Sequence, residues 1–150
     1  AGRPVPRGLA ADDAPPVTPG APDPGVLLAQ AGAEHRAGRR GAARALIEQA
    51  LAAEPRFGEA WRALATVHAE DGRHEAAVAA LGTALACGVA RPHEAHLQRA
   101  VWFADDLRRD DAAQAELEAA LALKPDYLPA LMNLGNLHEQ RGQREAALAC

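Results

Sequence analysis

Aromatic residues are scarce in this sequence, at 3% of the chain, although hydrophobic residues account for 49%. The apolar content is therefore mostly Ala and Leu, which have the highest helix propensities among apolar residues. Clusters of β-branched and aromatic residues, which mark strands, are scarce as well. These shortages argue against a β-rich fold and predict an all-α fold, and 150 residues are enough for one domain with its own core.

An excess of basic charge, paired cysteines and long apolar runs are also lacking. The net charge is -4, so the chain lacks the basic stripe with which a nucleic-acid binder displaces counterions. Cys87 and Cys150 are too few for a disulfide framework or a zinc set. The longest apolar run, around 79–90, is too short and too interrupted by Gly to span a bilayer. We therefore predict no nucleic-acid and no membrane partner.

No signal peptide opens the chain, so we favour a cytoplasmic over a secreted protein and leave the compartment open. The use of Arg in place of Lys and the high Ala content indicate a GC-rich bacterial genome. The sequence begins without Met and stops at Cys150 within a helical pattern, which we interpret as a piece of a longer protein.

Residues 1–23 are rich in Pro, Gly and Ala and hold almost no large apolar side chain. Such a segment buries too little surface to offset the entropy of ordering it, so it is predicted to be a disordered linker. The alternative is a Pro-rich peptide docked by another domain, and no PxxP motif with flanking basic anchors supports it.

From Pro24 onward the sequence repeats with a period near 34 residues. Large residues step by 34, 36 and 34 positions along one column, which consists of Leu27, Trp61, Leu97 and Leu131. Small residues step identically along a second column, which consists of Ala43, Ala77, Ala113 and Ala147. Several columns with one shared offset indicate an array of equivalent units, with two residues inserted within 88–93.

Each repeat is predicted to contain two helices. The first helices are expected at 24–37, 58–71, 94–107 and 128–141, and the second at 41–53, 74–87, 110–123 and from 144 onward. Gly38, Gly72 and Gly142 fall at the turns between them, where a left-handed residue often ends a helix. Arg108 takes this place in the third unit, within a charged turn that we expect to differ locally.

A two-helix unit of 34 residues with these columns resembles the tetratricopeptide repeat. The residues that carry the resemblance best are Trp61, Leu64, Ala65, Gly72, Ala77, Leu81 and Ala84, followed by Leu131, Leu134, Gly135, Gly142 and Ala147. The resemblance implies a right-handed superhelical solenoid of antiparallel helix pairs over 24–150. Its units are expected at 24–57, 58–91, 94–127 and 128–150, with the last one incomplete.

The resemblance also implies that the first helices line a concave groove that binds a protein or peptide. The groove positions are Arg62, Thr66, Gln98, Trp102, Asp105, Met132, Asn133, Asn136 and Glu139. Trp102 is either an interface anchor in the groove or a packing residue between repeats, and the sequence leaves both open. The Lys, Asn and Arg set with which some family members grip a peptide carboxylate is not matched, which disfavours that kind of clamp.

Catalytic, cofactor and metal signatures are not found in the sequence. There is no phosphate-binding Gly-rich loop, no HExxH motif and no Ser/His/Asp set, so this segment is predicted to be no enzyme. His93 and His96 have a spacing that can bind a metal, but two ligands make no site and we expect exposed side chains. The carboxylates along 105–111 and 116–118 are interpreted as solvated helix faces.

The leading hypothesis is a scaffold that binds a peptide or a partner helix in the concave groove. The alternative is an accessory repeat region of a larger bacterial enzyme, such as a sulfotransferase, glycosyltransferase or hydroxylase, by resemblance to arrays that precede such domains. A third hypothesis is self-association through the exposed last repeat.

Overall fold

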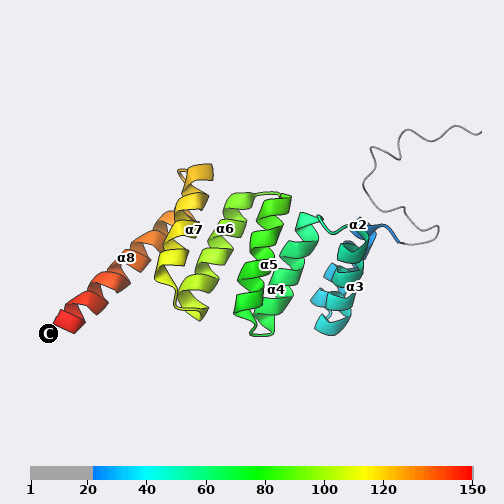
Figure 1. The fold of residues 1–150 in the computed structure, drawn as a ribbon, viewed down its shortest axis with the longest axis horizontal. Helices are drawn as coiled ribbons and strands as arrows, with labels where there is room; N and C mark the ends of the chain where they lie inside the picture. The colour runs from blue at the N-terminus through cyan, green and yellow to red at the C-terminus, as the bar shows by residue number, and fades with distance from the viewer. Residues whose placement is uncertain (1–21, 150) are drawn as a thin grey trace, which may run out of the picture. The chain divides into compact units, whose positions relative to one another are not determined.

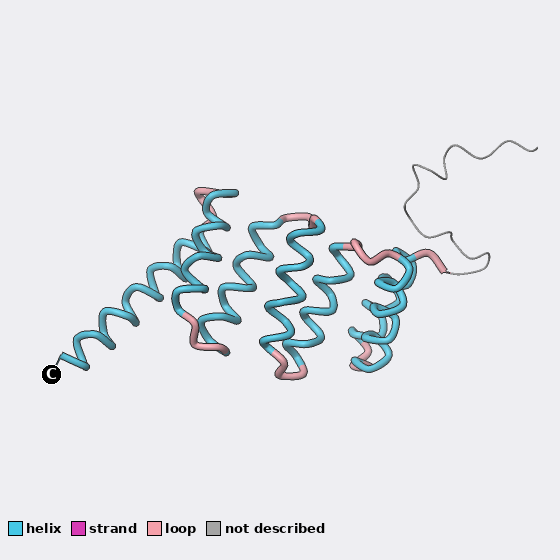
Figure 2. Tube along the Cα trace, in the orientation of Figure 1, coloured by secondary structure: helices cyan, strands magenta, loops and turns pink. Residues whose placement is uncertain are grey.

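The structure, a computed structural model, describes residues 22–149. The linker expected at 1–23 therefore lies almost entirely outside the described residues. The chain divides into two compact units, residues 1–56 and 57–150, and each is described by itself. All regular structure within residues 22–149 is helical (Figure 2), which confirms the predicted all-α class.

The described residues of unit 1 form a helix pair, α2 (Pro24–Arg36) and α3 (Arg40–Ala53) (Figure 1). Asp23 caps α2, because its carboxylate accepts hydrogen bonds from the backbone N–H groups of Gly25 at 2.9 Å and Val26 at 3.3 Å. Pro24 follows at the first helical position, where its missing N–H costs nothing. The two helices pack through buried Leu27, Ala31, Ala43, Ile47 and Ala50.

Unit 2 contains the remaining helices, which follow one another in chain order in Figure 1. They are α4 (Gly58–Glu70), α5 (His74–Cys87), α6 (Pro92–Val101), the π-helical η1 (Trp102–Asp106), α7 (Asp110–Leu123) and α8 (Leu128–Ala149). In this unit α5 packs against α4, α6 and η1, and α7 packs against α6, η1 and α8. Two helices, α5 and α7, have the bounds that the sequence predicts.

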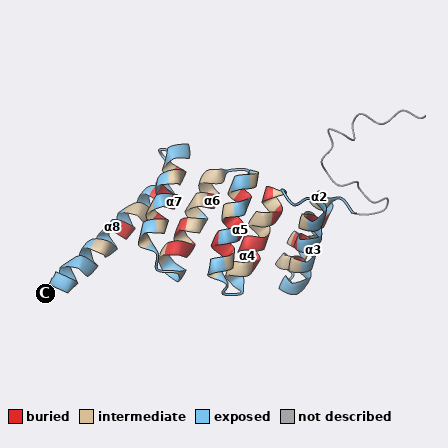
Figure 3. Cartoon of the chain, in the orientation of Figure 1, coloured by how far each residue is buried: buried red, intermediate tan, exposed pale blue. Residues whose placement is uncertain are grey.

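The alanine column marks the places where helices cross most closely. Ala43, Ala77 and Ala113 are completely buried, and Figure 3 shows buried segments within the helices with exposed segments between them. A larger side chain at such a crossing would overpack it, which typically costs about 1–3 kcal/mol. The repeat signal in the sequence is therefore a packing signal.

The insertion at 88–93 forms a short connection that is held against α4. Gly88, with φ of 104°, ends α5, and Pro92 begins α6. The backbone N–H of Ala90 donates to the Glu59 carboxylate at 2.8 Å, and Arg62 donates to the Ala90 carbonyl at 2.9 Å. Two side chains of α4 thus bond both backbone polar groups of one loop residue, so the connection has a fixed position against α4.

The third repeat, residues 94–127, ends its first helix differently from the other repeats, as expected from its charged turn. In η1 the Leu107 N–H donates to the Trp102 carbonyl at 3.0 Å, five residues back. Arg108 then takes a φ of 56°, in the left-handed region that Gly38 and Gly72 occupy at the corresponding turns. A side chain in that region costs about 1 kcal/mol relative to glycine.

The turn expected at Gly142 is wrong, because α8 continues through it from Leu128 to Ala149. Gly142 lacks the positive φ that Gly38 and Gly72 have, and Ala147, expected at a helix crossing, is exposed. A continuous helix satisfies the backbone hydrogen bonds of the residues around Gly142 within the helix itself, without a new nucleus.

Candidate partner-binding groove

Unit 2 has a pocket of about 430 Å³ between α4, α5, α6 and the loop before α8. Its lining residues are Arg62, Thr66, Leu81, Glu94, Leu97, Gln98, Val101, Trp102 and Tyr127. The structure thus brings four of the predicted groove residues together in one hollow. A concave site with apolar walls and a few polar groups is the usual form of a ligand pocket.

Four predicted groove residues meet in this pocket, and they differ in their freedom to contact a ligand. Thr66 and Gln98 are exposed, and the Thr66 hydroxyl donates to the Arg62 carbonyl at 3.3 Å. Arg62 is half-buried and already engaged, because it donates to the Ala90 carbonyl and its Nη2 lies 3.8 Å from Oε2 of Glu94. Thr66 and Gln98 are therefore the positions at which the pocket can be altered without disturbing its walls.

Trp102 combines the two roles that the sequence left open. Its side chain belongs to the buried core, with 7% of the residue exposed, and it also lines the pocket. The start of η1 at this residue places a large ring between the core and the hollow. Trp102 therefore supplies an apolar wall and little surface of its own, unlike an anchor that projects from a face.

The other predicted groove residues lie outside the pocket lining. They are Asp105 of η1 and Met132, Asn133, Asn136 and Glu139 of α8. Met132 is 59% exposed, and the Asn133 side-chain amide donates to the Pro129 carbonyl at 2.7 Å. Asn136 and Glu139 are exposed. They remain predictions as groove positions.

Sequence reasoning missed Glu94, Leu97 and Tyr127 as pocket residues. Glu94 accepts from Arg91 at 2.7 Å as well as lying near Arg62, so it holds the loop end of the pocket in place. The Tyr127 ring meets the His93 ring edge-on, with centroids 4.8 Å apart. Tyr127 comes from the loop between two repeats, so no helical column could have indicated it.

A buried charge cluster joins α5, α6 and α7 behind the pocket. Glu116 is only 9% exposed, so its interpretation as part of a solvated face is wrong. Its carboxylate bonds Nδ1 of His96 at 2.6 Å and also accepts from Arg99, which in turn donates to the Val78 carbonyl at 2.8 Å. The Arg99 side chain passes over Gly82, where an added Cβ would lie 2.9 Å from its Nη2.

The two histidines expected to be exposed are half-buried instead. His96 is held by Glu116 and His93 by the ring of Tyr127. One signal for Glu116 was available in the sequence, because positions 113, 116, 117 and 120 form the buried stripe of α7. A carboxylate in such a stripe calls for a cation from a neighbouring helix.

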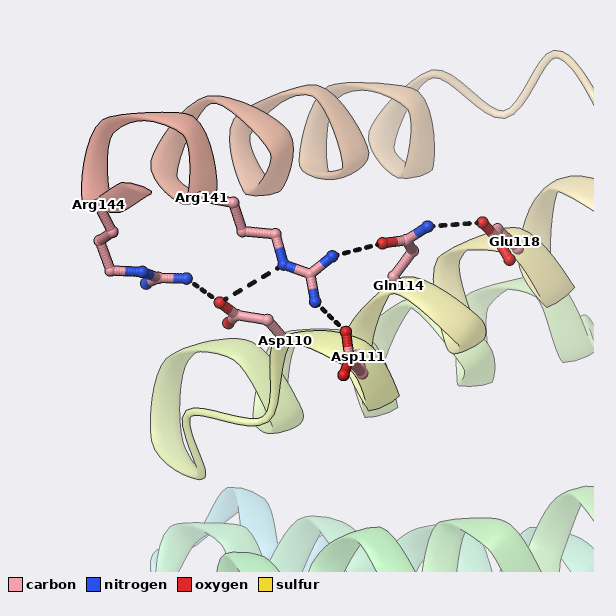
Figure 4. Close-up of polar contacts among 6 residues, drawn as sticks. All are labelled: Asp110, Asp111, Gln114, Glu118, Arg141 and Arg144. Carbon is pink, nitrogen blue, oxygen red and sulfur yellow. Dashed lines mark hydrogen bonds and ion pairs between the residues drawn. The ribbon is translucent and has the colours of Figure 1, made fainter. Parts of the chain in front are cut away.

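A second polar cluster fixes α8 to α7 (Figure 4). Arg141 donates to the Gln114 side-chain oxygen at 2.7 Å and to Asp111, and Arg144 donates to Asp110. Arg141 and Arg144 lie on either side of Gly142, so both anchors rely on the continuous helix. The cluster holds the side of α8 that faces α7 and leaves the opposite side of α8 uncovered.

No metal site and no membrane span are found in the part of the chain that the structure describes. Residues 22–149 hold no group of three or more His, Cys, Asp or Glu side chains that could bind a metal ion. None of the helices between residues 22 and 149 is long and apolar enough to cross a bilayer.

The helix pairs, the alanine crossings and the pocket on the first helices define an α-helical hairpin repeat protein. The model of the tetratricopeptide repeat family matches residues 28–95. Residues 28–95 are therefore similar to tetratricopeptide repeats. A search of curated proteins found no match.

Solved structures of similar fold are 17–24% identical to the chain in the following three cases. The crystal structure of MamA has a TM-score of 0.72 and 21% identity, covering 84% of this chain and 72% of that one. The first tetratricopeptide domain of Spaghetti (RPAP3), bound to the HSP90 peptide SRMEEVD, has a TM-score of 0.71 and 17% identity, covering 80% and 94%. An O-GlcNAc transferase mutant of Thermobaculum terrenum has a TM-score of 0.64 and 24% identity, covering 76% of this chain and 22% of that one.

Proposed function

We propose that unit 2 is a protein-binding scaffold that receives a peptide or a partner helix on its first helices, at the pocket beside Trp102. The pocket supports this proposal most directly, because it gathers Arg62, Thr66, Gln98 and Trp102 from two repeats into one hollow of about 430 Å³. The RPAP3 domain, which shares the fold, is described with a bound peptide. Asp105, Met132, Asn133, Asn136 and Glu139 extend the proposed surface along η1 and α8.

The walls of the pocket suit a side chain of mixed character. Leu97, Val101 and Trp102 offer apolar surface, while Gln98 and Glu94 offer hydrogen-bonding groups. A peptide gains affinity when an apolar side chain is desolvated in such a hollow and its neighbours meet a polar rim. The chemistry is recognition without bond making, so no cofactor is required.

The test is a selection of binders from a random library of 12-residue peptides, with the full chain as bait. Thr66→Trp should abolish binding of the selected peptides, because it fills the pocket from an exposed position without removing a core contact. The matched control is Thr83→Trp on α5. Thr83 is also exposed, and its hydroxyl donates to the Ala79 carbonyl, four residues back, just as that of Thr66 does to Arg62.

Selected peptides that bind both variants equally well would rule out the pocket as the binding site. Circular dichroism of both variants establishes that each is folded before binding is compared. Self-association through α8 stays a separate prediction. The exposed Leu128, Leu131, Met132 and Leu148 support it, and a monomeric mass by light scattering at high concentration would count against it.

A second candidate function is an accessory repeat region of a larger enzyme. The likeness to the O-GlcNAc transferase supports it, because this chain corresponds to only 22% of that protein. Sequencing the gene beyond the codon for Cys150 tests this candidate. A catalytic domain downstream is the expected result, and a stop codon directly after the fourth repeat would exclude it.

A further inference from the structure

The acidic excess of this protein is concentrated in unit 2. Residues 57–149 contain 14 acidic and 9 basic residues, a net charge of -5, whereas the whole chain carries -4. Residues 1–56 are thus slightly basic. An electrostatic preference of the chain for a partner is therefore a property of unit 2, which also contains the pocket.

All four arginines of the first helices in unit 2 are engaged within the unit. Arg62 bonds Ala90, Arg99 bonds Val78 and Glu116, and Arg141 and Arg144 bond the start of α7. These helices contain no lysine. Their positive charge is therefore used inside the fold, and none of it is left free for an acidic ligand.

Three carboxylates of the same helices, those of Asp105, Glu139 and Glu145, are left without such contacts within residues 22–149. Asp105 and Glu139 are exposed, and neither makes a hydrogen bond or an ion pair within residues 22–149. They are 34 positions apart, like Leu97 and Leu131, so they hold equivalent places in consecutive repeats. Equivalent places in stacked repeats lie in a row along one side of the array.

The first carboxylate of this row lies close in sequence to the pocket residue Trp102. Asp105 comes three residues after Trp102 on the same helical segment, and Glu139 comes three residues after Asn136, which is the counterpart of Trp102 in the next repeat. The two carboxylates thus follow the pocket position and its counterpart at the same spacing in consecutive repeats. Aromatic walls next to carboxylates are also favourable surroundings for a cation.

We infer that the partner of this groove is a positively charged peptide segment. Its Lys or Arg side chains meet Asp105 and Glu139, and a neighbouring apolar side chain enters the pocket beside Trp102. This inference rests on the proposed function and adds the charge of the partner to it. It also sets the groove apart from one suited to the peptide SRMEEVD of the RPAP3 complex, which has three acidic residues and one basic residue.

The test uses the charge of the peptides selected from the library and a pair of charge-matched variants. The selected peptides should be enriched in Lys and Arg, and SRMEEVD should not bind. The variant with Asp105→Lys and Glu139→Lys should lose about tenfold in affinity for a selected peptide by fluorescence anisotropy at low salt, since two ion pairs are reversed. The loss should shrink as salt is raised.

The control variant carries Glu48→Lys and Glu54→Lys in unit 1. Both residues are exposed and lie in or next to α3, so they belong to unit 1 and not to the helices that carry the proposed surface. The two variants have the same net charge, so equal losses of affinity would show a general charge effect and overturn the inference. Enrichment of acidic or uncharged peptides would overturn the inference as well. If such peptides nevertheless lose binding to the Thr66→Trp variant, the proposed function stands although the inference about charge fails.

Discussion

Removal of the Glu116 carboxylate by Glu116→Ala is expected to lower the free energy of unfolding by about 3 kcal/mol. The carboxylate holds two partners from α6, because it bonds His96 at 2.6 Å and also accepts from Arg99. Without it, the Arg99 guanidinium keeps its hydrogen bond to the Val78 carbonyl and its contact with the Phe103 ring. A partly buried positive charge then remains without a counter-charge.

The magnitude follows from how deeply the three groups are buried. Breaking a buried ion pair by removing one partner typically costs about 3–5 kcal/mol. The Glu116 side chain is 12% exposed, but that of Arg99 is 25% exposed and can turn part of its charge toward water. The lower end of the range therefore applies.

Two further variants separate charge from shape. Glu116→Gln keeps the shape and one acceptor for Arg99, so about 1–2 kcal/mol is expected. The double variant with Arg99→Met and Glu116→Met removes both charges and fills the space with apolar atoms. Replacement of a buried pair in this way is often neutral, so the double variant should be more stable than Glu116→Ala.

The measurement is urea denaturation followed by circular dichroism, with the midpoints compared at equal slope. Glu118→Ala is the control, because Glu118 is exposed on the same helix and accepts only from Gln114. It should change stability by less than about 0.5 kcal/mol. A Glu116→Ala variant as stable as this control would refute the reasoning, since the buried carboxylate would then hold nothing in place.

Arg108→Gly should raise the free energy of unfolding by about 1 kcal/mol and Gly72→Ala should lower it by a similar amount, because both positions are left-handed. Urea denaturation midpoints of the two variants that move in the same direction would contradict this. Gly142→Ala should stabilise α8 by about 1 kcal/mol, since nothing lies near an added Cβ and alanine favours helix; a loss of helicity by circular dichroism would instead indicate a turn there. The hydrogen bond from Arg39 holds the pKa of Glu34 below its ordinary value of 4.5. The pKa of Glu34 is therefore lower in the folded state than in the unfolded state. The pair stabilises unit 1 at pH values above the unfolded pKa, and this contribution is lost as the pH falls through the folded pKa. An NMR titration should show the low pKa of Glu34, and Arg39→Met should return it to about 4.5.

The helix pairs could be predicted because their signals are local or strictly periodic. Ala77 and Ala113 repeat where helices touch, and Gly72 lies where the chain must turn. Each of these residues acts on neighbours within a few positions or on an equivalent place one repeat away. The bounds of α5 and α7 followed from such signals without knowledge of any contact.

The pocket was predicted only in part, because its walls come from segments that no period links. Arg62 and Gln98 share a column, so their meeting could be expected. Tyr127 and Glu94 reach the same hollow from a loop and from a helix start, and only the packed unit brings them there. The sequence likewise could not decide between the two roles of Trp102, since both place it on the same helix face.

By itself, the sequence determined the fold class, the repeat period and the order of the helices. A 34-residue period with small residues at fixed places can bury its apolar faces in one kind of stacked array. The tertiary structure decided the pairing of Glu116 with His96 and Arg99, whose partners lie 20 and 17 residues away. It also decided that α8 runs straight through Gly142, because whether a glycine turns the chain depends on what is available to pack against the helix that follows it.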